Sequence, residues 1–205
     1  MEVGGSKKLS PMSHLSIGLL TVGKPKGTFD FLRTGEALYQ KRLAAYCDFT
    51  WQVVPEEKIT VGKPDDVIKA AEAERLLRAI PEGMTVVALS EEGQLWESRM
   101  VARWLAQLQG WTVPPHLAET PVSSKSHLWM DGRQSPPDRG MGSWPAGPIM
   151  MVVGGPLGLA QSVRQRAHGV WSLSPLTFPH PVVPLLVLEQ LYRGFTLLHQ
   201  HPYHK

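Results

Sequence analysis

The chain has 205 residues, 42% of them hydrophobic, which is enough apolar material to bury one substantial core. Its formal net charge of +3 is too small to indicate nucleic-acid binding on charge alone, because such domains usually carry a dense basic face. The single cysteine, Cys47, excludes an internal disulfide framework, so we expect one domain in the reducing cytoplasm, with Cys47 as a buried structural residue rather than a nucleophile.

The sequence shows no candidate for a membrane span and no clear targeting signal. The longest apolar run, at 182–188, is interrupted by Pro184 and is far shorter than the roughly 20 residues that cross a bilayer. Residues 1–14 contain two lysines but no apolar segment ahead of a cleavage site, so we interpret them as a disordered leader. We therefore expect a soluble protein with no membrane partner.

The first half of the chain alternates between strand and helix patterns. Apolar residues alternate with small ones over 15–23, which predicts a strand. Near-helical apolar spacing follows over 29–46, and 49–54 returns to strand character. The segment 64–80 begins with a proline and two aspartates, which favour the first turn of a helix.

The second half repeats this alternation. We expect strands at 84–90, 148–155 and 171–174, and helices at 98–108, 160–169 and 182–198. Ser98 is expected to cap its helix, and Gly169 to end the next one. The strands at 84–90 and 148–155 are almost continuously apolar, as in strands covered on both faces. The order strand, helix, repeated five times, predicts an α/β fold of doubly wound type, with a mostly parallel sheet covered by helices on both faces.

One segment, 111–147, interrupts this order. It is rich in proline, glycine and serine, and a structureless loop of this length is uncommon inside a compact domain. Its three tryptophans argue against simple disorder, because disordered segments are poor in aromatic residues. We interpret it as an insertion in a single domain over 15–205; a functional flap is the alternative.

Functional residues are expected in three loops that follow predicted strands, because ligands of parallel sheets bind at the carboxyl ends of the strands. The loops are Leu89–Ser98, Val152–Gln161 and Ser172–Pro181. In the second loop, paired glycines allow the backbone to approach a ligand closely. The pattern is not GxGxxG and has no acidic residue placed for a ribose, which disfavours a nicotinamide dinucleotide. A simple tight turn remains open.

Four motifs in chain order carry a resemblance to a known family: "VVGGPLGL" at 152–159, "SLSPLTFPH" at 172–180, "EQLYRGF" at 189–195 and "HPYHK" at 201–205. With these motifs the chain resembles the SPOUT superfamily enzymes that methylate the N3 nitrogen of a pseudouridine in 23S ribosomal RNA. The resemblance is close over 148–205 and loose over 15–110. The leader and the segment 111–147 lie outside it.

The resemblance implies a fold, a cofactor and an assembly. The C-terminal part of the sheet would be threaded into a deep trefoil knot, an exception to the rule that chains avoid knots. Two copies would form a homodimer, with S-adenosyl-L-methionine bent into the knot and no metal. The implied cofactor-binding residues are Leu89, Gly154, Gly155, Leu173, Ser174, Pro175, Leu176, Thr177 and Phe178.

The resemblance also suggests catalytic candidates, beginning with the C-terminal tail. In the similar enzymes the tail reaches the active site of the dimer partner, so Tyr203 and His204 would contact the substrate base or the ribosome. A histidine can accept a proton near neutral pH, and a phenol can donate a hydrogen bond to a uracil carbonyl. His180 is a second candidate, with a packing role as its alternative. For the tail histidines, a solvated cluster or a metal site with His199 and His201 stays open.

One departure concerns the start of the last helix. Many similar enzymes carry an arginine where this chain has Pro184, so another cation, such as Arg193, would have to replace it. Arg193 also stands four residues after Glu189, which is the spacing of an ordinary ion pair. A catalytically silent ribosome-binding protein is therefore one alternative function, and a methyltransferase with another RNA target is a second.

The resemblance implies 23S rRNA as the RNA partner. The modest charge suits recognition of an assembled ribosomal surface by the dimer better than tight binding of free RNA. The candidate basic patch comprises Lys24, Lys26, Arg33, Lys41 and Arg42. A solvated helix face is the alternative role of these residues.

Overall fold

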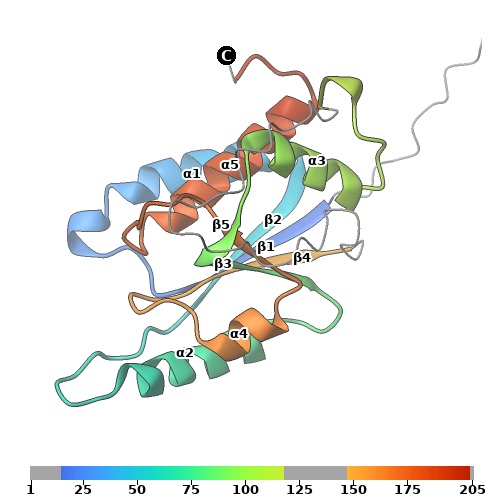
Figure 1. Ribbon diagram of the computed structural model, residues 1–205. Coiled ribbons are helices and arrows are strands. Elements are labelled where there is room, and N and C mark those ends of the chain that lie inside the picture. The colour runs from blue at the N-terminus through green and yellow to red at the C-terminus, as the bar shows by residue number, and fades with distance from the viewer. Residues whose placement is uncertain (1–14, 118–146, 204–205) are drawn as a thin grey trace, which may run out of the picture.

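The computed structural model of the chain describes residues 15–117 and 147–203 (Figure 1). The predicted leader at 1–14, most of the predicted insertion and the candidate residue His204 lie outside the described residues. Within those ranges, no helix combines the length and the apolar character needed to cross a bilayer.

A five-stranded parallel sheet forms the centre of the molecule. Its strands are β1 (Leu15–Val22), β2 (Cys47–Val54), β3 (Thr85–Leu95), β4 (Ile149–Val153) and β5 (Gly169–Ser172). They lie in the order β2-β1-β4-β3-β5, and every neighbouring pair is parallel. The central strand β4 is buried along its whole length, as its continuous apolar run predicts.

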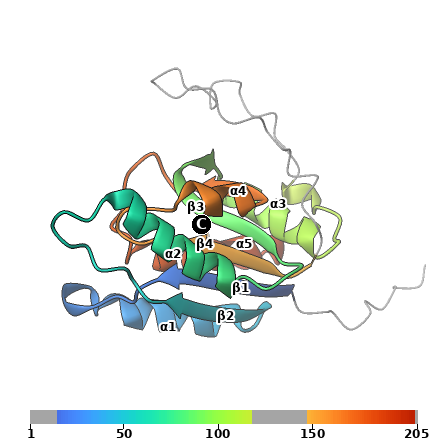
Figure 2. The same ribbon diagram turned by 90° about the horizontal axis from the view of Figure 1, so that it is seen from below.

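Helices cover both faces of this sheet. On one face lie α1 (Leu32–Leu43), α3 (Ser98–Leu108) and α5 (Val183–Leu198), and on the other lie α2 (Asp65–Ala79) and α4 (Gln161–Arg166) (Figures 1 and 2). Two short 3-10 helices, η1 (Gly27–Phe29) and η2 (Pro115–Leu117), lie in the connections. The predicted α/β fold is therefore confirmed. The threading of a knot stays a prediction.

Each face of the sheet has its own apolar core. The larger core lies under α1, α3 and α5 and includes the fully buried side chains of Trp104, Trp171 and Phe195. The smaller core lies under α2 and α4 and includes Leu76 and Val163. Because β1, β3 and β4 contribute to both cores, the strands that lead into the predicted functional loops are fixed from both sides.

The first predicted loop, Leu89–Ser98, is for the most part not a loop. Strand β3 continues to Leu95, and its pairing with β5 shifts between Leu89 and Gln94. Gly93 makes this possible, because a Cβ atom there would lie 2.7 Å from the backbone of Val170 and Trp171. The missing side chain allows the extended strand to pass close over β5.

Two smaller expectations at element ends are also wrong. Helix α4 ends at Arg166 and β5 already begins at Gly169, where the helix was expected to end. His168 fixes this early start, because its Nδ1 atom accepts a hydrogen bond of 2.9 Å from the Val86 N–H group. Ser98 is the first residue of α3 rather than its cap, and its hydroxyl donates to Gln190 Oε1 at 2.8 Å.

Candidate active site

A pocket of about 320 Å³ lies at the carboxyl ends of β3, β4 and β5. The three predicted functional segments supply most of its walls. Among its lining residues are Leu89, Gly154, Gly155, Leu173, Ser174, Leu176, Thr177 and Phe178. Pro175 belongs to the same loop but lies outside the lining. The structure therefore brings all the predicted cofactor residues except Pro175 to one cavity.

The glycine loop after β4 is a tight turn that leaves no room for side chains at Gly154 and Gly155. The Gly158 N–H group donates a hydrogen bond of 2.9 Å to the Gly155 carbonyl oxygen, and Gly158 has a φ of 79°. A Cβ atom on Gly154 would lie 2.8 Å from the Gly158 carbonyl carbon. The turn and the close approach to a ligand are thus compatible, since Gly154 and Gly155 both line the pocket.

The loop after β5 is held by its own serines. The Ser172 hydroxyl donates to the Ser174 carbonyl oxygen at 3.1 Å, and Ser174 Oγ accepts a hydrogen bond of 3.0 Å from the Leu176 N–H group. Leu176 stands at the rim with 70% of its surface exposed. An exposed apolar side chain beside a cavity is available to cover the face of a bound ring.

Charged side chains from two helices on one face of the sheet, and from strand β3, also reach this pocket. Lys69 comes from α2 and Arg164 from α4, while Glu91 and Glu92 come from the extended part of β3. Arg164 Nε lies 3.5 Å from Glu92 Oε2, and Arg164 also donates to the Leu159 carbonyl oxygen at 2.6 Å. Glu91 and Glu92 belong to the predicted functional segment Leu89–Ser98, although neither was singled out. Lys69 and Arg164 were missed, because no motif indicates which helix side chains point toward the strand ends.

His180 lines the same pocket, just before the first turn of α5. It also lines a small adjoining hollow with Pro184. Burial lowers the pKa of His180, and Glu56 opposes this effect. The imidazole is therefore neutral at pH 7 and can accept a proton.

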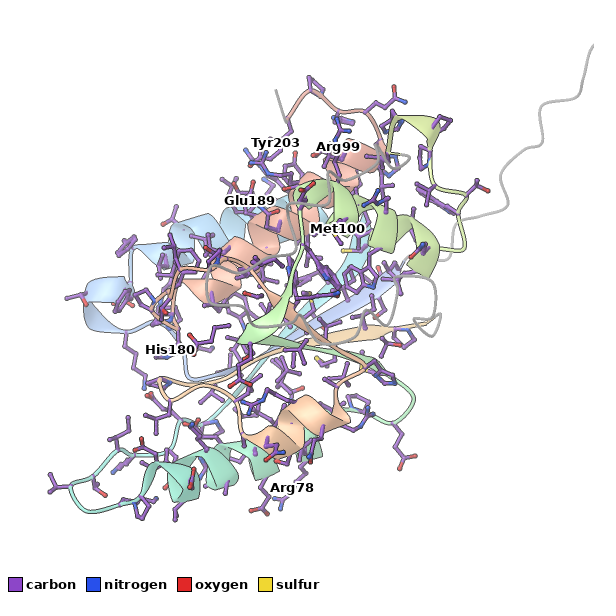
Figure 3. All side chains as sticks on the ribbon, viewed as in Figure 1. Arg78, Arg99, Met100, His180, Glu189 and Tyr203 are labelled. Carbon is purple, nitrogen blue, oxygen red and sulfur yellow. The ribbon has the colours of Figure 1, made fainter. Side chains whose placement is uncertain are left out.

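Tyr203, in the tail after α5, lies beside Arg193 of α5 in what we call the tyrosine cluster: Tyr39, Tyr192, Tyr203, Arg42, Arg193 and Glu189. The hydroxyls of Tyr39 and Tyr203 share a hydrogen bond of 2.9 Å, and Tyr203 donates to Glu189 Oε1 at 3.2 Å. Arg193 Nη2 donates to the same carboxylate oxygen at 2.6 Å, which confirms the predicted ion pair. Figure 3 shows Tyr203 and Glu189 well apart from His180.

The cluster fixes the protonation states of its members. Burial and the hydrogen bond with Tyr39 raise the pKa of Tyr203, so its phenol stays protonated at neutral pH. The hydrogen bond to Glu189 raises the pKa of Arg193. Tyr203 can therefore donate a hydrogen bond but is a poor proton acceptor. Neither Tyr203 nor Arg193 lines the pocket of its own chain.

The tail histidines that the structure describes pack against aromatic rings. His199 lies 5.3 Å from the Tyr46 ring and 5.7 Å from the Trp111 ring, and burial lowers its pKa. His201 lies 6.5 Å from the Tyr46 ring. Over 15–117 and 147–203, no group of three potential ligands is placed to hold a metal ion.

The remaining predicted features lie outside the pocket lining. Four residues of the basic patch are exposed, while Arg42 is half-buried with its guanidinium 5.3 Å from the Tyr192 ring. Cys47 is buried, which raises the pKa of its thiol to about 12 and leaves it neutral. Pro184 is buried in the first turn of α5, where proline is tolerated.

Comparison with known proteins gives the following similarities. The sequence profile of a family described as predicted SPOUT methyltransferase matches residues 15–114 and 142–204. The ribosomal RNA large subunit methyltransferase H of Thioalkalivibrio sulfidiphilus is 34% identical over 93% of this chain and 99% of its own length. The protein of that name from Pseudomonas aeruginosa is 36% identical over 82% of this chain and 86% of its own. Among solved structures, a probable methylase family protein from Haemophilus influenzae covers 93% of this chain and 71% of its own, with 13% identity and a TM-score of 0.42.

Proposed function

The chain belongs to the family of predicted SPOUT methyltransferases, and on this premise we propose that it transfers a methyl group from S-adenosylmethionine to RNA of the large ribosomal subunit. The observation that carries this proposal is the pocket at the ends of β3, β4 and β5, which collects the cofactor residues implied by the sequence. The relatives named as large-subunit rRNA methyltransferases support the choice of RNA.

The chemical groups that line the pocket suit this cofactor. Leu89, Leu173 and Leu176 supply apolar surface for a base, and the main chain of the glycine loop supplies polar groups that no side chain blocks. Lys69 and Arg164 suit a carboxylate, while Glu91 and Glu92 suit ribose hydroxyls. S-adenosylmethionine, when bound, supplies a methyl group on a positively charged sulfur.

The protein itself must orient the accepting nitrogen and take up one proton. We propose that His180 accepts the proton released by the accepting nitrogen, because its imidazole is neutral and lines the pocket. Tyr203 would donate a hydrogen bond to the substrate base, and His204 would contact the base or the ribosome. Arg193 would hold RNA phosphate in place of the arginine that Pro184 replaces.

The roles proposed for Tyr203 and Arg193 require a second copy of the chain. Tyr203 and Arg193 lie outside the pocket of their own chain, whereas the resemblance implies that the tail acts at the active site of a dimer partner. We therefore propose a homodimer in which the pocket of one copy is completed by the tail of the other. The target we propose is the N3 nitrogen of a pseudouridine in 23S rRNA of assembled ribosomes, in the cytoplasm.

The decisive experiment is mass spectrometry of the pseudouridine-containing 23S rRNA hairpin. Purified 70S ribosomes that lack the modification are incubated with the protein and S-adenosylmethionine, and free 23S rRNA is treated in parallel. We expect one added methyl group at N3 on ribosomes and little on free RNA. A methyl group on another nucleotide would instead identify a methyltransferase with another RNA target.

The catalytically silent alternative is tested separately by isothermal titration calorimetry. Pro184 motivates it, because the similar enzymes often have an arginine at this position. We expect the protein to bind S-adenosylmethionine. If no binding is detected at millimolar cofactor, the protein is a ribosome-binding member of the family without methyltransferase activity.

A further inference from the structure

Glu72 is an acidic residue in an apolar position. It lies inside α2, on the face that packs against the sheet, and only 3% of its surface is exposed. Acidic side chains are rarely buried to this extent unless they are paired. Its position therefore calls for a physical explanation.

The polar contacts of Glu72 leave one oxygen free. Oε1 accepts a hydrogen bond of 3.0 Å from the Glu57 N–H group, while Oε2 is buried and has no hydrogen-bond partner among the described residues. The nearby guanidinium of Arg75 is bound to the Glu57 carboxylate and to the Pro55 carbonyl oxygen. No cation on the described chain therefore pairs directly with the free oxygen of Glu72.

This free oxygen lies against a glycine of the pocket wall. A Cβ atom on Gly155 would lie 2.8 Å from Glu72 Oε2 and 3.0 Å from Oε1, so the carboxyl group packs directly on the glycine backbone. Gly155 lines the pocket, whereas Glu72 is not among the lining residues. The buried carboxyl group is thus in contact with the wall of the space that the cofactor would occupy.

The surroundings make a negative charge at Glu72 costly unless a cation is near. Burial raises the pKa of Glu72, the hydrogen bond from Glu57 opposes this, and of the charged neighbours Glu56 and Glu57 raise the pKa whereas Arg75 lowers it. A positive charge in the pocket would stabilise the ionised carboxylate across the glycine, because electrostatic interactions are only weakly screened away from water.

We propose that Glu72 is a specificity-determining residue of the pocket, which favours a positively charged occupant over a neutral one of the same shape. This inference rests on the proposed function. The methyl donor is a sulfonium, whereas the product S-adenosylhomocysteine is a neutral thioether. Glu72 thus allows the pocket to prefer the donor and to release the product.

The test is the ratio of two dissociation constants measured by isothermal titration calorimetry, that of S-adenosylhomocysteine divided by that of S-adenosylmethionine. Glu72→Gln keeps the size of the side chain and the acceptor for the Glu57 N–H group, but removes the charge. We expect it to lower the ratio roughly tenfold, mainly by weakening donor binding. Glu74→Gln removes an exposed charge from the same helix and is the matched control, for which we expect an unchanged ratio.

An unchanged ratio in Glu72→Gln, or an equal loss of affinity for both compounds, overturns the role of Glu72 and leaves the cofactor assignment intact. A wild-type protein that binds neither compound overturns both. The wild-type protein also gives a second measurement, in case Glu72→Gln does not fold. An analogue with a protonated amine in place of the sulfonium should bind more tightly than the thioether, and the reverse order overturns the inference.

Discussion

The pocket and the tyrosine cluster are both anchored on α5, but they are built in different ways. The pocket at the start of α5 depends on main-chain turns, and its glycines Gly154 and Gly155 are placed where side chains would collide. The tyrosine cluster, along the middle of α5, depends on side chains that contact one another and encloses no part of the pocket lining. The residues that line the pocket thus come from one chain, whereas Tyr203 and Arg193 lie outside its lining.

The largest effect is expected when a side chain is introduced into the glycine turn of the pocket. Gly154→Val places a branched side chain where even a Cβ atom would lie 2.8 Å from Gly158, so the turn must open. We expect the affinity for S-adenosylmethionine, measured by calorimetry, to fall roughly 100-fold. Gly110→Ala strains a glycine with a φ of 66° outside the pocket lining, and it should leave the affinity intact. Unchanged affinity in Gly154→Val would contradict the pocket assignment.

The next largest effect is expected at His180, the proposed proton acceptor in the pocket. His180→Gln should lower the methyl-transfer rate roughly 100-fold at saturating cofactor, because the proton acceptor is lost. Since burial lowers the pKa of His180, the wild-type rate should fall with decreasing pH only below the usual histidine range. Single-turnover assays across pH measure both effects. An equal rate loss in His116→Gln, outside the pocket, would remove His180 from the mechanism.

A smaller effect is expected from a change in the tyrosine cluster. It can also show whether Tyr203 acts at the pocket of its own chain or at that of a dimer partner. Tyr203→Phe removes the hydroxyl that bonds Tyr39 and Glu189 and that we expect to donate to the substrate base. Loss of that one bond to the base should lower the transfer rate roughly tenfold with unchanged cofactor affinity. Mixing this variant with Gly154→Val, under conditions that exchange subunits, should restore activity if Tyr203 acts on the pocket of the partner. If Tyr203 acts on its own pocket, the mixed dimer is no more active than the Tyr203→Phe variant.

The smallest effect concerns the ion pair inside the cluster. Arg193→Gln breaks the contact with Glu189, whose side chain is 17% exposed, so we expect a loss of about 1 kcal/mol in the free energy of unfolding. Arg78→Gln breaks a pair whose side chains are 76% and 70% exposed, and it should cost less. Thermal denaturation compares the two variants. An equal loss of unfolding free energy in the two variants would mean that the Arg193–Glu189 pair stabilises the fold no more than an exposed surface pair.

The contrast also explains which parts of the site could be predicted. The glycine loop and the loop after β5 follow apolar strands, and loops at the carboxyl ends of parallel strands gather at one edge of the sheet. Their convergence needed only the alternation of strands and helices. Lys69, Arg164 and Glu72 were missed, because their place beside the pocket depends on how α2 and α4 pack against the sheet.

Strand β3 shows the same limit within a single element. Its apolar run ends near Ser90, so periodicity predicts a loop where the strand in fact continues to Leu95. The continuation exists because Gly93 can pass close over Val170 and Trp171 of β5, which lie far along the chain. A contact between distant segments decided where this strand ends.

The sequence by itself determined the alternation of strands and helices, the parallel sheet and the glycine turn, because these depend on side-chain periodicity and on the freedom of glycine. Only the tertiary structure decided the strand order, the separation of Tyr203 from the pocket and the burial of Glu72 behind Gly155. Such features arise when distant segments compete for the same space and for the same hydrogen-bond partners, and no local pattern records the outcome.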